Sequence, residues 1–168
     1  MKGGFEAMIC HHDSCICETL NELLLEQFQL ATQKFKFICE YDKVDTIPFI
    51  LYTKEDSEPF RAHLHSNCTI FFKLLDIADG CATLRLLTGM DIDGYITDDA
   101  DDLFALYQTD KCISIDCNCF LGIQPLPPKF VNRKLPDIGR GGPKGRGSSE
   151  QGMGPEYGSD FDRECEDK

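Results

Sequence analysis

The chain has 168 residues and a formal net charge of −12. This length suits one domain with appendages, and the acidic charge disfavours nucleic acid and anionic membranes as partners. No apolar run approaches the roughly 18 residues that a membrane-spanning helix needs, and the first residues lack the apolar run of a secretory signal. We therefore expect synthesis in a cytosol, without membrane insertion.

Taken in chain order, the first predicted element is an amphipathic helix over about residues 18–33. Its apolar side chains recur at helical spacing, and acidic side chains lie between them. The period then changes, because residues 47–53 are β-branched and aromatic and predict a strand. A polar turn over 54–57 and a short strand over 58–62 follow.

The strongest hairpin signal comes next. Residues 69–75 and 81–87 are two strand-like segments, and they flank an Asp79-Gly80 pair that suits positive φ angles. The second segment alternates as expected for a sheet with one wet face. Its apolar residues face one way and its polar residues the other: Ala82, Leu84 and Leu86 against Thr83 and Arg85.

Two further strands are predicted over 111–115 and 120–124, after an acidic loop. Three prolines (Pro125, Pro127 and Pro128) then end the regular structure, since proline removes a ladder donor. The resulting fold class is mainly β, an antiparallel β-sandwich or small barrel with one N-terminal amphipathic helix. The predicted boundaries are a Cys/His-rich arm over 1–17, a domain over 18–128 and a disordered Gly- and charge-rich tail over 129–168.

Ten cysteines in a chain without a recognisable export signal are unexpected, because a reducing cytosol keeps thiols free. Metal ligation, catalysis and later cross-linking compete as explanations. The weak metal alternative uses the amino-terminal cluster Cys10, His11, His12, Cys15 and Cys17. Structural zinc sites pair two ligand knuckles, and no second CxxC or HxxxH is present. We therefore expect no metal and no other cofactor.

Two other chemical patterns are weaker still. Residues 89–96 are similar to the middle of a calcium loop, but Gly89 stands where the first Asp belongs and Ala100 where the bidentate Glu belongs. A nucleophilic cysteine needs a nearby base, and His63 and His65, which precede Cys68, are the only histidines outside the arm. The interpretation is that the chain is not an enzyme.

Several segments together resemble the CotY, CotZ and ExsY family of spore outer-coat and exosporium proteins. They are Cys15-Ile16-Cys17-Glu18, the DTIPFILYTK run at 45–54 with Glu58-Pro59-Phe60, the CATLRLL run at 81–87, and CISID at 112–116 with Cys119-Phe120 and Ile123-Gln124. The resemblance spans about residues 10–126, and the order and spacing of the segments carry it.

The resemblance implies a structural protein, made in the mother cell and deposited on the spore surface in the outer coat, crust or exosporium. There it would self-assemble with itself and with other coat proteins into a protective layer cross-linked by disulfides. Oxidation after mother-cell lysis would explain the cysteines. The cross-linking candidates are Cys10, Cys15, Cys17, Cys112, Cys117, Cys119 and Cys165.

Two points stay open from the sequence. Cys68 and Cys81 are expected to be buried in or beside the sheet, while Cys112, Cys117 and Cys119 suit either burial or cross-linking, since a buried free cysteine packs as a small hydrophobe. The alternative function is a coat adaptor, or a Cys/His metal-binding protein, that forms no lattice.

Overall fold

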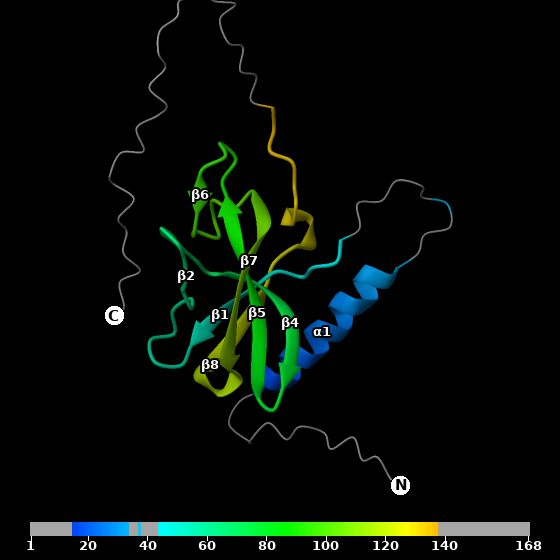
Figure 1. Cartoon of the computed structure of the whole chain (residues 1–168), viewed down its shortest axis with the longest axis vertical. Coiled ribbons are helices and arrows are strands. Elements are labelled where there is room, and N and C mark those ends of the chain that lie inside the picture. Colours follow the sequence, from blue (N-terminus) through cyan, green and yellow to red (C-terminus); the bar gives the residue numbers. More distant parts are fainter. Residues whose placement is uncertain (1–14, 34–36, 38–43, 138–168) are drawn as a thin grey trace, which may run out of the picture.

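A computed structural model describes residues 15–33, 37 and 44–137 (Figure 1). It is mainly β and antiparallel with one helix near the N-terminus, which confirms these parts of the predicted fold class. The elements in chain order are α1 (Ile16–Thr32), β1 (Phe49–Thr53), β2 (Ala62–Leu64), β3 (Asn67–Thr69), β4 (Phe71–Ala78), β5 (Cys81–Met90), β6 (Ile96–Thr97), β7 (Ala105–Asp116), the 3₁₀ helix η1 (Cys117–Cys119), β8 (Phe120–Pro125) and the 3₁₀ helix η2 (Pro128–Phe130).

Six strands form one antiparallel sheet in the order β6-β5-β4-β1-β8, and β7 pairs with the other side of β5. Strands β2 and β3 form a separate hairpin whose Ala62 and Leu64 contribute to the main core. The predicted hairpin is present between β4 and β5. Its turn residues Asp79 and Gly80 both have positive φ, 53° and 74°, as a two-residue turn of matching twist requires.

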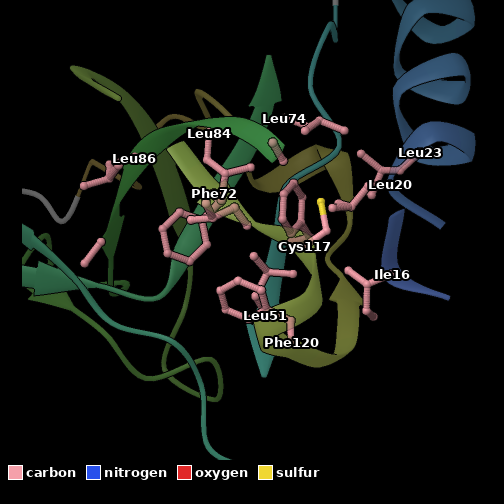
Figure 2. Packing of buried hydrophobic residues seen from close by; sticks show 14 of the residues in the cluster. Ile16, Leu20, Leu23, Leu51, Phe72, Leu74, Leu84, Leu86, Cys117 and Phe120 are labelled. Atoms are coloured by element: carbon pink, nitrogen blue, oxygen red, sulfur yellow. The ribbon is translucent and has the colours of Figure 1, made fainter. Parts of the chain in front are cut away.

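Helix α1 covers one face of the sheet. Alternate residues of β1, β4 and β5 point to this face, and the inner stripe of the helix packs on them (Figure 2). Phe49, Leu51, Phe72, Leu74, Ala82, Leu84 and Leu86 come from the sheet, and Ile16, Cys17, Leu20 and Leu23 from α1. We call this the helix-covered face. Burial of this size dominates the stability of a small domain.

A buried glutamine fixes the helix to the sheet. Gln27 donates from Nε2 to the carbonyl oxygen of Leu74 at 2.9 Å and accepts at Oε1 from the backbone N–H of Ile47 at 3.1 Å. Leu74 lies beyond the pairing of β4 with β1, so its carbonyl needs a partner from elsewhere. Within the described part of the chain, α1 and the two short 3₁₀ helices are too short or too polar to span a bilayer.

The opposite face is covered over only part of its area. Ile50, Phe71, Leu87 and Leu106 are buried there with residues from the chain after β8. The remaining area, which we call the open face, carries alternate residues of β5 and β7, and these are exposed or half-buried: Cys81, Thr83, Arg85, Cys112, Ser114 and Asp116.

The ordered domain continues beyond the predicted boundary at residue 128. Val131 bridges Leu106, and the N–H of Asn132 donates to the Leu106 carbonyl at 2.8 Å. The guanidinium of Arg133 lies 3.8 Å from the centre of the Phe104 ring. These contacts extend the described structure past residue 128, the predicted end of the domain, and they close one end of the β7 edge. Residues 138–168, the rest of the predicted tail, and residues 1–14 of the predicted arm lie outside the described residues.

Two strand boundaries also differ from expectation. Strand β7 begins at Ala105 instead of residue 111, because its first half pairs with the second half of β5 across an irregular register. The predicted short strand at 58–62 is a single bridge between Tyr52 and Pro59, and strand β2 begins only at Ala62. Proline has no N–H to donate to a ladder.

Candidate functional site

The cysteines in the described part of the chain, apart from the disulfide-bonded Cys68, divide into two classes by exposure. Those that are exposed are Cys15, Cys81, Cys112 and Cys119, and those that are buried are Cys17 and Cys117. Of the other predicted cross-linking residues, Cys10 and Cys165 lie outside the described residues. A free cysteine normally packs inside a protein as a small hydrophobe. The exposed class is therefore the unusual one.

The two buried thiols belong to the core. Cys17 is 3% exposed, in the first turn of α1 and on the stripe that faces the sheet. Cys117 is 0% exposed, and its sulfur lies between the sheet and Leu20 of the helix (Figure 2). Both are among the cross-linking candidates that the sequence supplies, and either sulfur would have to leave the core to bond a second subunit.

Three of the exposed thiols lie at one end of the domain. Cys81 begins β5 and is paired with Asp116, and the N–H of Cys117 donates to the Gly80 carbonyl at 3.0 Å. This bond holds η1, which carries Cys119, beside the β4–β5 turn. Helix α1 begins at the same end (Figure 1) and contacts η1, and Cys15 is the N-cap residue of this helix. Cys81 is exposed, which corrects the expectation that it is buried.

Cys112 lies apart from that end, on the open face. It is opposite Arg85, and the next outward pair along the ladder is Ser114 with Thr83. Arg85 donates to the Gln108 side chain at 3.2 Å, and Gln108 donates to Thr46 at 3.5 Å. Cys112 is therefore held on a strand of a rigid sheet with a cationic side chain across from it.

An ion pair lies on the same face of the sheet. The carboxylate of Asp45 lies 3.5 Å from Nζ of Lys73, whose side chain is largely buried. Burial raises the pKa of Asp45, but the hydrogen bond from Thr46 and the charge of Lys73 lower it by more, so the pKa lies below its usual value. Asp45 is thus held in its charged form.

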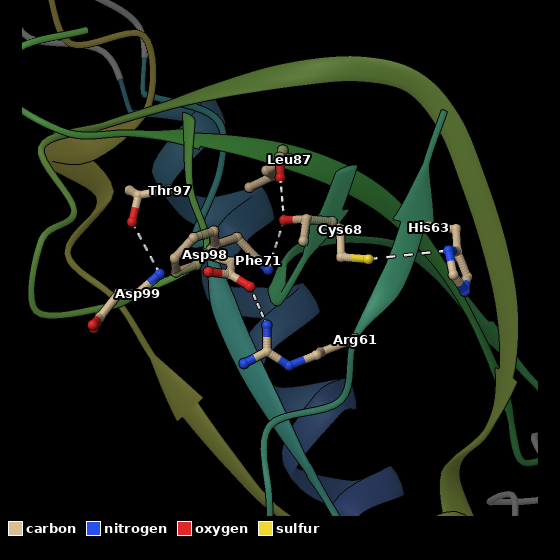
Figure 3. Close-up of polar contacts among 9 residues, drawn as sticks. Arg61, His63, Cys68, Phe71, Leu87, Thr97, Asp98 and Asp99 are labelled. Atoms are coloured by element: carbon tan, nitrogen blue, oxygen red, sulfur yellow. Dashed lines mark hydrogen bonds and ion pairs between the residues drawn. The ribbon is translucent and has the colours of Figure 1, made fainter. Parts of the chain in front are cut away.

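The structure brings His63 and Cys68 together as cross-strand partners of the β2–β3 hairpin (Figure 3). The Nδ1 atom of His63 is 4.0 Å from Sγ of Cys68. Cys68 is disulfide-bonded, so this sulfur is not a nucleophilic thiol in the structure. The pair does not form the activated nucleophile that the sequence left open.

The calcium-like pattern is a turn. The Asp91 carboxylate accepts the N–H groups of Asp93 and Tyr95, each at 2.9 Å, and Gly94 has a φ of 86°. Asp98 in the following loop forms an ion pair with Arg61 (Figure 3). These carboxylates satisfy backbone and arginine donors.

Within residues 15–33, 37 and 44–137, no group of three or more His, Cys, Asp or Glu side chains is placed to hold a metal ion. Three members of the alternative metal set, Cys10, His11 and His12, fall outside those ranges. Cys17, its last member, packs in the core.

Comparison with known proteins gives a consistent result. The family described as Spore coat protein Z matches residues 6–128. Spore coat protein Z of Bacillus subtilis (strain 168) is 34% identical over 102 residues, covering 53% of this chain and 68% of that protein. No solved structure matches the chain.

The match contains α1, the eight strands and every cysteine that the structure describes. Its extent exceeds half of the chain, and its end at residue 128 coincides with the start of η2. The chain therefore belongs to the spore coat protein Z family.

Proposed function

We propose that this protein is a structural subunit of the spore coat that associates with copies of itself and with other coat proteins, and that its exposed cysteines cross-link the layer. Membership of the spore coat protein Z family supports the coat role. Synthesis takes place in the mother cell, and deposition on the spore surface precedes oxidation.

The observation that carries the cross-linking proposal is the exposure of Cys15, Cys81, Cys112 and Cys119 as free thiols. Exposed free cysteine is a liability in a protein that works as a monomer, because it oxidises and forms mixed disulfides. In a layer the same chemistry stabilises contacts between subunits. Two thiols lose two protons and two electrons to an external oxidant and form one disulfide.

The placement of these thiols suits a two-dimensional array. Cys15, Cys81 and Cys119 lie at one end of the domain, and Cys112 lies on the open face, so one subunit can bond neighbours in more than one direction. Many cross-links per subunit turn weak contacts into a network in which the loss of one bond releases nothing.

The test is electron microscopy and non-reducing electrophoresis of the full-length protein, with and without reductant. We expect sheets or rings, together with covalent multimers that reductant removes. A variant in which Cys15, Cys81, Cys112 and Cys119 are all serine should lose most of these multimers. The matched control is Ser114→Ala, which changes the same surface and removes no thiol.

Two results would overturn the proposal. One is a protein that stays monomeric at high concentration under oxidising conditions, which would favour an adaptor role. The other is an undiminished ladder of multimers in the four-serine variant, which would place the cross-links on other cysteines.

A further inference from the structure

The two outer edges of the six-stranded sheet differ. The β8 edge is short and ends at Pro125, with Pro127 and Pro128 after it, a pattern that blocks further pairing. The β7 edge spans twelve residues and contains no proline. Its first part is closed by the contacts of Val131 and Asn132 with Leu106. Its second part, residues 112–116, has no strand beside it in the described portion of the chain.

The direction of the backbone groups along this second part follows from one hydrogen bond. The N–H of Cys117 points to β5, where it donates to the Gly80 carbonyl. Backbone direction alternates along a strand, and the register from 112 to 116 is uninterrupted. Cys112, Ser114 and Asp116 therefore direct their N–H and C=O groups away from the sheet.

We infer that residues 112–116 of β7 form a pairing edge for the same edge of a second copy of this chain, in antiparallel orientation. The inference rests on the proposed self-association and adds the surface through which it begins. An edge paired with itself about a two-fold axis is self-complementary by symmetry, and it joins two sheets into one continuous sheet.

One register satisfies all the outward groups. With Ser114 on the two-fold axis, Cys112 lies opposite Asp116 of the second copy, and each outward residue exchanges two hydrogen bonds. A shift of two residues in either direction leaves one of the three without a partner on each chain. A slip of one residue sets outward groups against inward ones, which an antiparallel ladder does not permit.

The side chains fit this register on both faces. Towards the core, Ile113 lies opposite Ile115 of the second copy, and such β-branched cross-strand pairs stabilise sheets. Ile113 is half-buried in the monomer, so pairing covers its remaining surface. On the open face, Asp116 of the second copy lies opposite Cys112. Arg85 is the partner of Cys112 on the other side, within the same sheet. This arrangement brings a carboxylate towards a guanidinium.

The register also predicts whether the two Cys112 residues of the dimer can form a disulfide with each other. The two Cys112 residues of such a dimer are offset by four positions, about 13 Å along the strands, which is too far for a disulfide between them. Both thiols stay exposed on the open face. The edge therefore joins two subunits without a covalent bond, and Cys112 remains available to a third subunit.

The test is sedimentation velocity of the full chain in reductant across a range of concentrations. Ser114→Pro removes an outward N–H and spares the ladder to β5, so the dimer dissociation constant should rise about tenfold or more, since at least two hydrogen bonds are lost. Ser114→Ala keeps the N–H and should dimerise as the unaltered protein does. Circular dichroism and thermal unfolding establish that each variant folds.

If Ser114→Pro does not fold, Ser114→Lys replaces it, since like charges would then face each other on the axis. Thr83→Lys is its control, because Thr83 faces the same way one strand further in. The inference fails if the reduced protein is monomeric throughout, or if Ser114→Pro and Ser114→Lys dimerise normally. Covalent multimers that still form under oxidation would then leave the proposed cross-linking intact.

Discussion

Cysteine side chains have opposite environments on the helix-covered face and on the open face of this sheet. On the first, Cys17 and Cys117 are packed among leucines and phenylalanines. At the margin of the second, Cys81 and Cys112 are exposed and free. Cysteine is thus a core residue on one side and a reactive surface group on the other, and the residue type alone does not reveal which.

The difference comes from local geometry. From Cys112 to Cys117 the side chains alternate between outside and inside. The 3₁₀ helix η1 begins at Cys117 and ends at Cys119, and it breaks this alternation, so that Cys117 is buried and Cys119 is exposed. Asp116 accepts the N–H of Asn118 at 2.9 Å and fixes this turn. A cysteine count therefore gives no count of cross-links.

The largest expected effect is on the helix-covered face, at Gln27. The change Gln27→Ala leaves the buried carbonyl of Leu74 and the N–H of Ile47 without their partner. We expect the free energy of unfolding to fall by about 2–4 kcal/mol, from two unsatisfied backbone groups. Urea unfolding in reductant measures it. Gln29→Ala, on the exposed side of the same helix, should change it by less than about 0.5 kcal/mol.

A smaller effect on stability is expected when a buried cysteine is replaced, and replacement of an exposed cysteine gives the direct comparison. The change Cys117→Ser places a hydroxyl in the core and should lower the free energy of unfolding by about 1–3 kcal/mol. The change Cys119→Ser, two residues away on the surface, should leave it within about 0.5 kcal/mol. Equal losses in urea unfolding would contradict the distinction between buried and exposed thiols.

The smallest expected effect is the pH dependence of the folding stability that Asp45, beside the open face, contributes. The folded-state pKa of Asp45 lies below its unfolded value, so its contribution to stability is present above pH of about 4 and is lost as the pH falls through the folded pKa. Asp45→Asn should therefore reduce stability at neutral pH and flatten the acid side of a stability–pH profile. Curves that stay parallel down to the acid limit would show that the pair with Lys73 contributes nothing.

Much of the fold follows from local sequence patterns. The alternation of residues 81–87 predicts which side chains are buried, and Asp79-Gly80 predicts the turn, because both signals depend on neighbouring residues. The helix is also predicted, with Leu20 and Leu23 on its inner stripe. Its buried polar residue is less predictable, since Gln27 is buried and Phe28 is 68% exposed. Only the position of Leu74 across the chain explains that choice.

The candidate site is less predictable than the fold. Exposure of Cys81 depends on its place at the margin of the open face, and burial of Cys117 depends on contact with α1, about 100 residues earlier in the chain. The first half of β7 is not predicted, because it is defined by its pairing with the second half of β5 across an irregular register. Such features arise from tertiary contacts that no local pattern encodes.

The most direct test of the central claim is to map disulfides between subunits. Full-length protein labelled with ¹⁵N is mixed with unlabelled protein, assembled, oxidised and digested without reduction, and disulfide-linked peptides are identified by mass spectrometry. Peptides that join a labelled and an unlabelled chain should contain Cys15, Cys81, Cys112 or Cys119. Mixed peptides through Cys17 or Cys117 from folded protein, or the absence of any mixed peptide, would contradict the claim.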